Sequence, residues 1–402
     1  MRLLFLSDNF PPESNAPAIR TYEHCSKWVQ MGYQVTVITC FPNFPKGKVF
    51  KGYRNKLYQK ENIDGIRIIR VWSFISENNG FVKRIIDYLS YAVTSFLFGF
   101  FEKTDLIIAT SPQFFTPISA RMLSFFKRIP WVMEVRDLWP DSIVAVGAMN
   151  KRSRTYKILK FIEHHLYSSA SKIIVVTDSF KEYLMSEHKI NSLKIGVFKN
   201  GVSLRNLRKP ELNEVNALRE SLVLQNKTVI SYIGTHGLAH GLKFILDCIS
   251  KISNPNVHFL FVGDGAEKES LIEYSKTLHS QNFTFVEGVS KSMVWLFIEI
   301  SDFALVNLKK SEEFKNVIPS KIFENIAMYK PILLGVAGES KKLIEKYEVG
   351  VCFEPENEKS FLNAIKDLGK IDREIFKVKC NMMLADFDRD NIAENLISFI
   401  VK

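Results

Sequence analysis

Cysteine is scarce in this sequence, with five among 402 residues. The five lie far apart and form no Cys-x-x-Cys pair: Cys25, Cys40, Cys248, Cys352 and Cys380. This spacing argues against a disulfide scaffold or a cysteine zinc site and favours the reduced thiols of a cytoplasmic protein. A signal peptide is not expected either, because a predicted strand, Leu3–Leu6, follows the first residues directly.

Long hydrophobic runs are also few. The longest, Ile85–Phe101, contains Asp87 and is slightly short for a helix that spans a bilayer. Lys83 and Arg84 precede it and Lys103 follows it. Two interpretations stay open: an interfacial helix that is basic at its start and aromatic along its length, or a helix buried in the core.

Positive charge is distributed unevenly along the chain, whose formal net charge is +11. Residues 1–200 contain 28 Lys and Arg against 16 Asp and Glu, whereas residues 201–402 contain 26 against 27. A one-sided basic excess predicts an anionic partner such as a membrane surface, a polyphosphate or a nucleic acid. The alternative is a basic face that is only solvated. No helix-turn-helix, zinc or aromatic RNA-binding motif supports a nucleic acid, so none is expected.

Short apolar runs alternate with stretches of helical length, a pattern typical of parallel sheets covered by helices on both faces. The first series of expected strands is Leu3–Leu6, Val35–Thr39, Ile66–Val71, Leu106–Ala109, Trp131–Val135, Ile173–Val176 and Lys194–Phe198. After a polar pause at Asn200-Gly201 the second series is Val229–Ile233, Val257–Val262, Phe283–Val286, Phe303–Val306, Ile332–Leu334 and Val351–Phe353. The pattern predicts two α/β domains, residues 1–199 and 200–385, and a C-terminal helix within 386–402.

Facing Rossmann-like domains bind ligands in the cleft at the carboxyl ends of their strands, so the loops after strands are the candidate sites. In the first domain, Asn15 stands where a loop of small and turn-forming residues enters a helix, either near a bound anion or as a simple helix cap. Arg136 and Asp137 follow a strand end and are suited to binding polar sugar groups; a salt-bridged turn is the alternative.

In the second domain, glycines open the loops after the first two strands. Five residues of the first loop, Gly234, Thr235, Gly237, His240 and Gly241, suit a diphosphate held by backbone N–H groups, with His236 and His240 as further donors. Gly263 and Gly265 flank Asp264 after the next strand, which indicates either a tight turn beside a flat ligand or a turn with no ligand. The Gly-Asp-Gly sequence lacks the third glycine of a dinucleotide fingerprint.

A helix start at Pro319 or Ser320 places Lys321 and Glu324 on one helical face. The lysine can neutralise a phosphate, and the carboxylate can accept hydrogen bonds from ribose hydroxyls. A surface ion pair worth a few tenths of a kcal/mol is the alternative. The position of the pair, in a strand-to-helix turn, favours a functional role.

These segments occur in an order that resembles the GT4 family of retaining glycosyltransferases, over essentially the whole chain. The matching segments are the first strand with its proline-rich loop, Lys199 to Val202, the loop at Gly234, Phe261 to Gly265, and Ser320 to Pro331. The resemblance implies a GT-B fold, which is an α/β architecture of two facing Rossmann-like domains with a cleft between them. It also implies a UDP-sugar donor held by the second domain, an acceptor held by the first, retention of anomeric configuration, and no metal or other cofactor.

By position, the resemblance assigns Glu324 to the ribose as the second glutamate of the family's Glu-x7-Glu motif, and Asn316 stands where the first would be. The family's phosphate-binding Arg and Lys fall on Thr235 and His240, and its His-Asp pair falls on Arg136-Asp137. Backbone groups of Gly237 and Gly241, with His240 and Lys321, are the expected substitutes for the phosphate clamp. The stretch Glu287 to Ser290, which includes Val289, corresponds to the backbone that reads the base.

A closer resemblance is to bacterial transferases of surface-polysaccharide assembly that carry Val-Arg-Asp-Leu-Trp-Pro-Asp and Pro-Ser-Lys-x-x-Glu, above all the N-acetyl-L-fucosamine transferases of O-antigen synthesis. It implies an undecaprenyl-diphosphate-linked sugar acceptor and a peripheral enzyme at the anionic inner face of the bacterial plasma membrane. In such front-face transfer, the second-domain loop stabilises charge that develops on the leaving diphosphate.

Two other classes remain open from the sequence. A UDP-sugar 2-epimerase has the same fold and needs no second substrate. A catalytically inactive partner subunit would also be consistent with the altered phosphate loop. The oligomeric state, the exact donor sugar and the linkage are not determined by these motifs.

Overall fold

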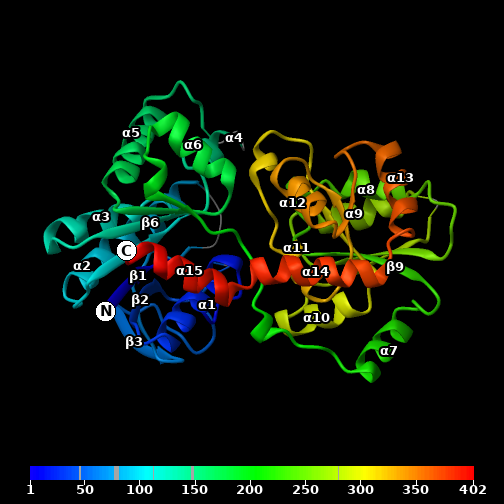
Figure 1. The fold of residues 1–402 in the computed structure, drawn as a ribbon, viewed down its shortest axis with the longest axis horizontal. Helices are drawn as coiled ribbons and strands as arrows, with labels where there is room; N and C mark the ends of the chain where they lie inside the picture. Colours follow the sequence, from blue (N-terminus) through cyan, green and yellow to red (C-terminus); the bar gives the residue numbers. More distant parts are fainter. Residues whose placement is uncertain (45–46, 77–80, 112, 146–148, 279) are drawn as a thin grey trace. The chain divides into compact units, whose positions relative to one another are not determined.

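The computed structural model describes residues 1–402 except 45–46, 77–80, 112, 146–148 and 279. The side chain of Arg84, named above, lies outside the described ones. The chain forms two compact units (Figure 1). Unit 1 contains Met1–Lys199 together with Arg389–Lys402, and unit 2 contains Asn200–Asp388.

Unit 1 is built on an eight-stranded sheet with the order β3-β4-β2-β1-β5-β6-β7-β8, parallel except for β3. The strands are β1 (Arg2–Leu6), β2 (Gln34–Cys40), β3 (Tyr58–Ile63), β4 (Ile66–Val71), β5 (Leu106–Thr110), β6 (Trp131–Val135), β7 (Lys172–Val175) and β8 (Ile195–Val197). Its interior strands are buried on both faces, as parallel strands between two helix layers must be.

Successive residues of β1 face opposite layers. Leu4 and Leu6 pack into a core with helices α2 (Phe81–Phe100), α3 (Thr116–Lys127), α5 (Arg154–Ser169) and α6 (Asp178–His188). Leu3 and Phe5 pack with helices α1 (Ala16–Gln30) and α15 (Arg389–Ile400). The short α4 (Asp141–Ala145) and η1 (Ser192–Lys194) complete unit 1.

The terminal helix α15 is part of the unit 1 core although it follows unit 2 in sequence. Trp28 Nε1 donates a hydrogen bond of 2.9 Å to the carbonyl of Ala393. Arg389 forms a buried ion pair with Glu23. Unit 1 is therefore assembled from the two ends of the chain.

Unit 2 contains a fully parallel six-stranded sheet of order β11-β10-β9-β12-β13-β14. Its strands are β9 (Thr228–Ile233), β10 (Val257–Val262), β11 (Phe283–Val286), β12 (Phe303–Asn307), β13 (Ile332–Gly335) and β14 (Gly350–Cys352). The helices are α7 (Leu212–Ser221), α8 (Leu242–Ile249), α9 (Lys268–Ser275), α10 (Lys291–Glu299), α11 (Lys321–Ala327), α12 (Glu339–Tyr347), α13 (Glu358–Leu368) and α14 (Arg373–Phe387), with short turns η2 (Leu204–Asn206), η3 (Leu238–His240) and η4 (Glu313–Asn316).

Every strand expected from the sequence is present, within two residues at each end. Strand β3 was not predicted. Its side chains alternate between exposed and half-buried, because it is the edge strand and pairs only with β4. Within the described residues, no helix combines the length and hydropathy needed to cross a membrane.

Candidate active site

The sheet of unit 2 changes direction between β9 and β12. From β9 the chain crosses to β10 on one side, and from β12 it crosses to β13 on the other. In open parallel sheets, ligands bind at the carboxyl ends of the two strands that flank such a reversal. The predicted donor residues gather at these ends.

The loop after β9 holds five of the predicted residues. It starts at Gly234, whose φ of +146° favours glycine, and it is closed by a 2.7 Å hydrogen bond from the Tyr232 hydroxyl to the Thr235 carbonyl. The turn η3 follows Gly237, and α8 begins only after Gly241, whose φ is +57°. The short turn η3 therefore lies between this loop and α8.

Backbone crowding explains the two glycines after β10. A Cβ on Gly263 would lie 1.9 Å from the carbonyl oxygen of Gly234, and one on Gly265 would lie 2.4 Å from that of His236. The His236 N–H donates to the Asp264 carbonyl at 2.9 Å. The backbones of the loops after β9 and β10 are therefore in direct contact, with no room for a side chain between them.

A buried lysine joins the loops after β10 and β11. Lys268 is 6% exposed, and its Nζ lies 3.2 Å from Asp264 Oδ1 and 2.8 Å from Glu287 Oε2. The Gly288 N–H donates to Asp264 Oδ2 at 3.1 Å. The predicted residue Val289 follows and packs partly buried beside α10. These pairings fix the path of the stretch expected to read the base.

Lys321 brings a cation to the end of β9. Its Nζ lies 3.9 Å from the centroid of the Tyr232 ring, and a Cβ on Gly234 would lie 2.9 Å from it. Nζ is buried and has no hydrogen-bond partner among the described residues. Burial lowers the pKa of this amine to about 7, although the nearby Glu324 carboxylate opposes the shift. A desolvated ammonium without an anion is a costly arrangement unless a ligand supplies the anion.

Two histidines stand near the same ring. His236 is fully buried, and neither of its ring nitrogens has a partner in the described part of the chain. His240 Nδ1 is also buried without a partner. Burial, reinforced by neighbouring lysines, lowers the pKa of each to about 4, so both are neutral at physiological pH. A neutral imidazole can donate one hydrogen bond to a phosphate but adds no charge.

Two contributors to this site were missed by sequence reasoning. Tyr232 lies under Lys321 and within 5.8 Å of both histidine rings, measured between centroids. Asn307, the last residue of β12, donates from Nδ2 to the His240 carbonyl at 2.8 Å, while its Oδ1 is buried and unpartnered within the described residues. A polar residue closing an otherwise apolar strand was the available signal for Asn307.

The remaining predicted residues of unit 2 surround the start of α11. Ser320 is its N-cap, and Glu324 lies one turn after Lys321, as expected from their spacing. Asn316 ends η4 on the segment before this helix. Contacts between these residues and a nucleotide stay a prediction.

In unit 1, Asn15 caps α1. Its Oδ1 accepts from the Ala18 N–H at 2.9 Å, and its Nδ2 donates to Asn9 Oδ1 at 2.7 Å. Both ends of the amide are therefore engaged locally, which is the simpler of the two interpretations given for it. The predicted contact of Asn15 with a bound anion stays a prediction.

Arg136 and Asp137 follow β6 at the carboxyl edge of unit 1. The Arg136 N–H donates to Ser111 Oγ at 2.8 Å, and its Nη1 is buried with no partner among the described atoms. Burial lowers the pKa of Arg136 to about 10, although Glu134 opposes the shift, and burial raises the pKa of Asp137. Glu134 itself is engaged by Arg20 at 3.0 Å. With a pKa of about 10, Arg136 remains charged at neutral pH. Its neighbour Glu134 is already paired with Arg20.

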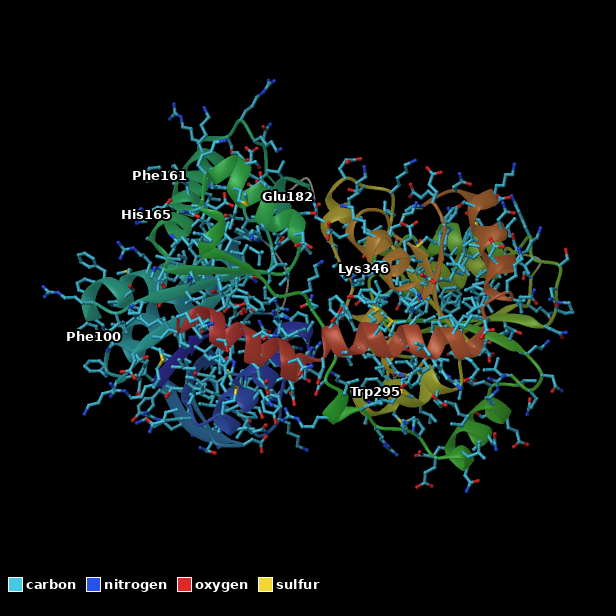
Figure 2. The ribbon with its side chains drawn as sticks, in the orientation of Figure 1. Phe100, Phe161, His165, Glu182, Trp295 and Lys346 are labelled. Atoms are coloured by element: carbon cyan, nitrogen blue, oxygen red, sulfur yellow. The ribbon has the colours of Figure 1, made fainter. Side chains whose placement is uncertain are left out.

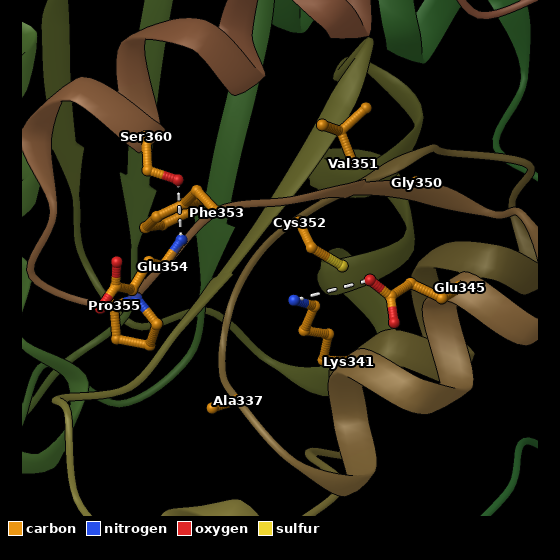
Figure 3. Close-up of a pocket in the computed structure, with 10 residues that line it drawn as sticks. All are labelled: Ala337, Lys341, Glu345, Gly350, Val351, Cys352, Phe353, Glu354, Pro355 and Ser360. Atoms are coloured by element: carbon orange, nitrogen blue, oxygen red, sulfur yellow. Dashed lines mark hydrogen bonds and ion pairs between the residues drawn. The ribbon is translucent and has the colours of Figure 1, made fainter.

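A hollow of 450 Å³ lies at the end of β14 in unit 2 (Figure 3). Lys341 and Glu345 of α12 approach each other to 3.7 Å, and the Cys352 side chain lies beside this pair in the lining. It contains none of the predicted donor residues. Across the residues described, no group of His, Cys, Asp and Glu side chains suits a metal ion.

Two Rossmann-like units with largely parallel sheets, and phosphate-compatible loops at the switch point of the second, define the GT-B class of sugar transferases. Solved structures share this fold along the whole chain. Sucrose-phosphate synthase of Thermosynechococcus elongatus superposes with a TM-score of 0.74 at 14% identity, covering 99% of this chain and 98% of its own. HepE of Anabaena, solved with UDP and glucose, gives 0.70 at 15% identity, covering 100% and 99%.

Two family models match complementary parts of the sequence. Residues 18–206 match Glycosyltransferase Family 4, and residues 215–377 match Glycosyl transferases group 1. WcaI of Escherichia coli K12, assigned as a glycosyl transferase to colanic acid biosynthesis, is 23% identical over 375 residues, covering 91% of each chain. The chain belongs to the family 4 glycosyltransferases of GT-B fold.

Proposed function

We propose that this enzyme transfers a sugar from a UDP-sugar to an undecaprenyl-diphosphate-linked acceptor during bacterial surface-polysaccharide or O-antigen synthesis. The configuration of the sugar is retained, no metal takes part, and N-acetyl-L-fucosamine is the sugar that the motifs favour. Similarity to WcaI supports the polysaccharide setting, and UDP bound to HepE supports the donor class.

The observation that carries the proposal is the Lys321 Nζ at the end of β9, which has no hydrogen-bond partner in the part of the chain that the structure describes. The pattern of this family would place its cations on the β9 loop, where the chain has Thr235 and His240. In this chain the cation is Lys321 of α11, a helix that follows β12 rather than β9. Its Nζ lies next to the β9 loop, 3.9 Å from the centroid of the Tyr232 ring. A diphosphate beside Gly234 would supply the missing partner of Lys321.

The chemistry follows from this placement. As the bond between sugar and diphosphate breaks, negative charge grows on the leaving phosphate, where Lys321 and backbone N–H groups stabilise it. The acceptor hydroxyl attacks from the same face, and its proton passes to the departing phosphate. Glu324 accepts hydrogen bonds from the ribose hydroxyls, and the backbone of Glu287–Ser290 contacts the base. Arg136 and Asp137 orient the acceptor.

Calorimetric titration with UDP tests the proposal. We expect binding in the micromolar range, weakened about 10- to 100-fold by Lys321→Met, as removal of a charge-assisted hydrogen bond predicts. Glu324→Ala should weaken it as well. Lys341→Met, which changes the hollow beside β14, is the matched control and should bind as the parent does.

Two outcomes would redirect the proposal. If neither UDP nor GDP binds, an inactive partner subunit becomes the better description. If UDP binds and a 2-epimer forms from the UDP-sugar without any acceptor, the protein is an epimerase of the same fold.

A further inference from the structure

Helix α2 exposes an apolar stripe. Among its residues with described side chains, every exposed one except Lys83 is a large hydrophobic residue. These are Ile86, Leu89, Val93, Leu97 and Phe100, between 44% and 57% exposed. Their spacing of three or four residues places them along one side of the helix. The opposite side, with Tyr91 and Ser95, is buried against unit 1.

Helix α3 continues this stripe. Its exposed positions are Met122, Phe125 and Phe126. The Phe126 ring lies 5.9 Å from that of Phe96 and 6.5 Å from that of Phe100, between centroids, so the two helices share one aromatic cluster. We call these residues the α2–α3 surface: Ile86, Leu89, Val93, Leu97, Phe100, Phe101, Met122, Phe125 and Phe126 (Phe100 is labelled at the periphery of unit 1 in Figure 2).

Scattered exposed hydrophobic residues are normal, but a continuous patch is not. The outward side of a helix on a solvated protein is usually charged or polar. On the α2–α3 surface the outward positions are instead aromatic and aliphatic, and Phe101 is 81% exposed. We therefore expect a binding partner to cover this surface.

The cations around the surface indicate what covers it. Lys83 lies near the start of α2 and Lys103 follows its end, whereas Arg121 and Lys127 belong to α3 and Arg128 follows it. The Arg121 guanidinium lies 5.7 Å from the Phe125 ring centroid, and Lys127 Nζ lies 5.6 Å from that of Phe100. Helix α3 contains no acidic residue, and α2 contains only Asp87, whose pKa burial raises to about 6. Glu102 is paired with Arg67.

A basic hollow of 830 Å³ opens at the C-terminal end of α2. Phe101 and Lys103 form part of its lining, together with Lys60, Arg2 and Arg67. Of the four cations in the lining, Arg67 pairs with Glu102 and Arg2 pairs with Asp105. The hollow therefore adjoins the exposed hydrophobic residues through Phe101, which belongs to both.

We infer that the α2–α3 surface docks unit 1 on an anionic lipid bilayer, with its aromatic side chains at the headgroup boundary and its cations against lipid phosphates. Apolar side chains flanked by lysine and arginine are the combination that binds a protein in the membrane interface. The inference deepens the proposed function, since a lipid-linked acceptor is met at such a surface. Its test needs no sugar transfer, so the two can fail separately.

Sedimentation of the full chain with vesicles is the experiment. The parent protein should bind phosphatidylglycerol-rich vesicles at low salt and bind pure phosphatidylcholine weakly. Leu97→Glu with Phe125→Glu should lower binding to anionic vesicles at least tenfold, because two apolar side chains that the bilayer would bury are replaced by carboxylates. Lys103→Glu with Arg128→Glu should lower it about tenfold or more and reduce the salt dependence.

The matched control is Leu212→Glu, at a residue of α7 in unit 2 that is 72% exposed, and it should leave vesicle binding unchanged. All substituted residues are exposed, and unchanged thermal melts and UDP titrations would show that the variants remain folded. Absence of parent binding, or full binding by both double variants, would overturn the inference. So would a parent dimer that Leu97→Glu with Phe125→Glu converts to monomer, since a second copy would then be the occupant.

Discussion

At the scale of the residue, the charge state of Lys321 is set by burial. With a pKa of about 7, the amine is only partly protonated at neutral pH in the free protein. A bound diphosphate favours the protonated form, so binding should draw in a proton. We expect UDP affinity to be highest below pH 7 and to fall as pH rises through and above 7.

Calorimetry in buffers of different ionisation enthalpy measures this proton uptake directly. Lys321→Met should remove both the uptake and the fall in affinity between pH 7 and 9, whereas Lys321→Arg should keep UDP binding and lose the pH dependence. If UDP affinity of the parent does not change across this range, Lys321 is not the phosphate cation.

His236 makes unit 2 sensitive to acid. Its pKa is lowered to about 4 in the folded protein from an ordinary 6.5, so the unfolded chain binds more protons between these values. The stability that the neutral ring contributes is complete above pH 6.5 and is lost as pH falls towards 4. The expected slope is about 1.4 kcal/mol per pH unit within this window.

Urea unfolding at pH 7 and pH 5 checks the effect of His236. The loss of stability between the two pH values should be smaller by about 1 to 2 kcal/mol in His236→Gln than in the parent. An equal loss in both proteins would mean that the imidazole titrates normally.

Sequence reasoning located the polar residues of the site better than the groups that orient them. Lys321 and the loop glycines stand in recognisable strand-to-helix turns. Tyr232 carries no such signal, since a tyrosine near the end of an apolar strand is ordinary core composition. Its contact with Lys321 joins residues far apart in the chain and depends on the order of β9 and β12 in the sheet.

At the scale of the element, the loops after β9 and β10 leave no room for a methyl group. Gly263→Ala would place Cβ 1.9 Å from the Gly234 carbonyl oxygen at a φ of +145°. We expect a loss of stability of about 2 kcal/mol or more and weaker UDP binding, because the two backbones must separate.

Gly237→Ala is the control for this prediction. The nearest atom to its added Cβ is 3.6 Å away, so its melting temperature should stay close to that of the parent. Thermal unfolding and UDP titration of the two variants give the comparison. Equal effects of both substitutions would show that the closeness of the two loops does not matter.

The unpredicted strand β3 shows a limit of hydrophobic patterning. Its residues are mainly polar, and the edge position needs no apolar run. The signal lay in the turn that joins it to β4: Asp64 and Gly65 both have positive φ, and Asp-Gly is a preferred hairpin turn. The apolar segment 85–101 was harder still to interpret. The sequence analysis offered an interfacial helix and a core helix as alternatives, whereas α2 is buried on one side and exposed on the other.

At the scale of the whole molecule, unit 1 depends on the last helix of the chain. Truncation after Asp388 would remove α15, uncover Trp28 and leave Glu23 without Arg389. We expect this chain to lose several degrees or more of melting temperature, or to become insoluble, because a buried pair and a core layer are lost together.

Removal of Val401 and Lys402 alone is the matched control, since both are exposed. It should leave the melting temperature unchanged. A chain ending at Asp388 that melts like the parent would contradict the assignment of α15 to the unit 1 core. The sequence predicted this helix but not its destination, because the contact joins residues 365 positions apart.

The return of α15 to unit 1 also sets an order of events on the ribosome. Trp28 leaves the exit tunnel before its partner Ala393, which is made 365 residues later. At about 5–20 residues per second, roughly 20 to 70 seconds separate them. Throughout that interval the nascent first unit presents an uncovered apolar layer while the second unit is completed. Translation speed and chaperone capacity, rather than sequence alone, should therefore govern how much active protein a cell obtains.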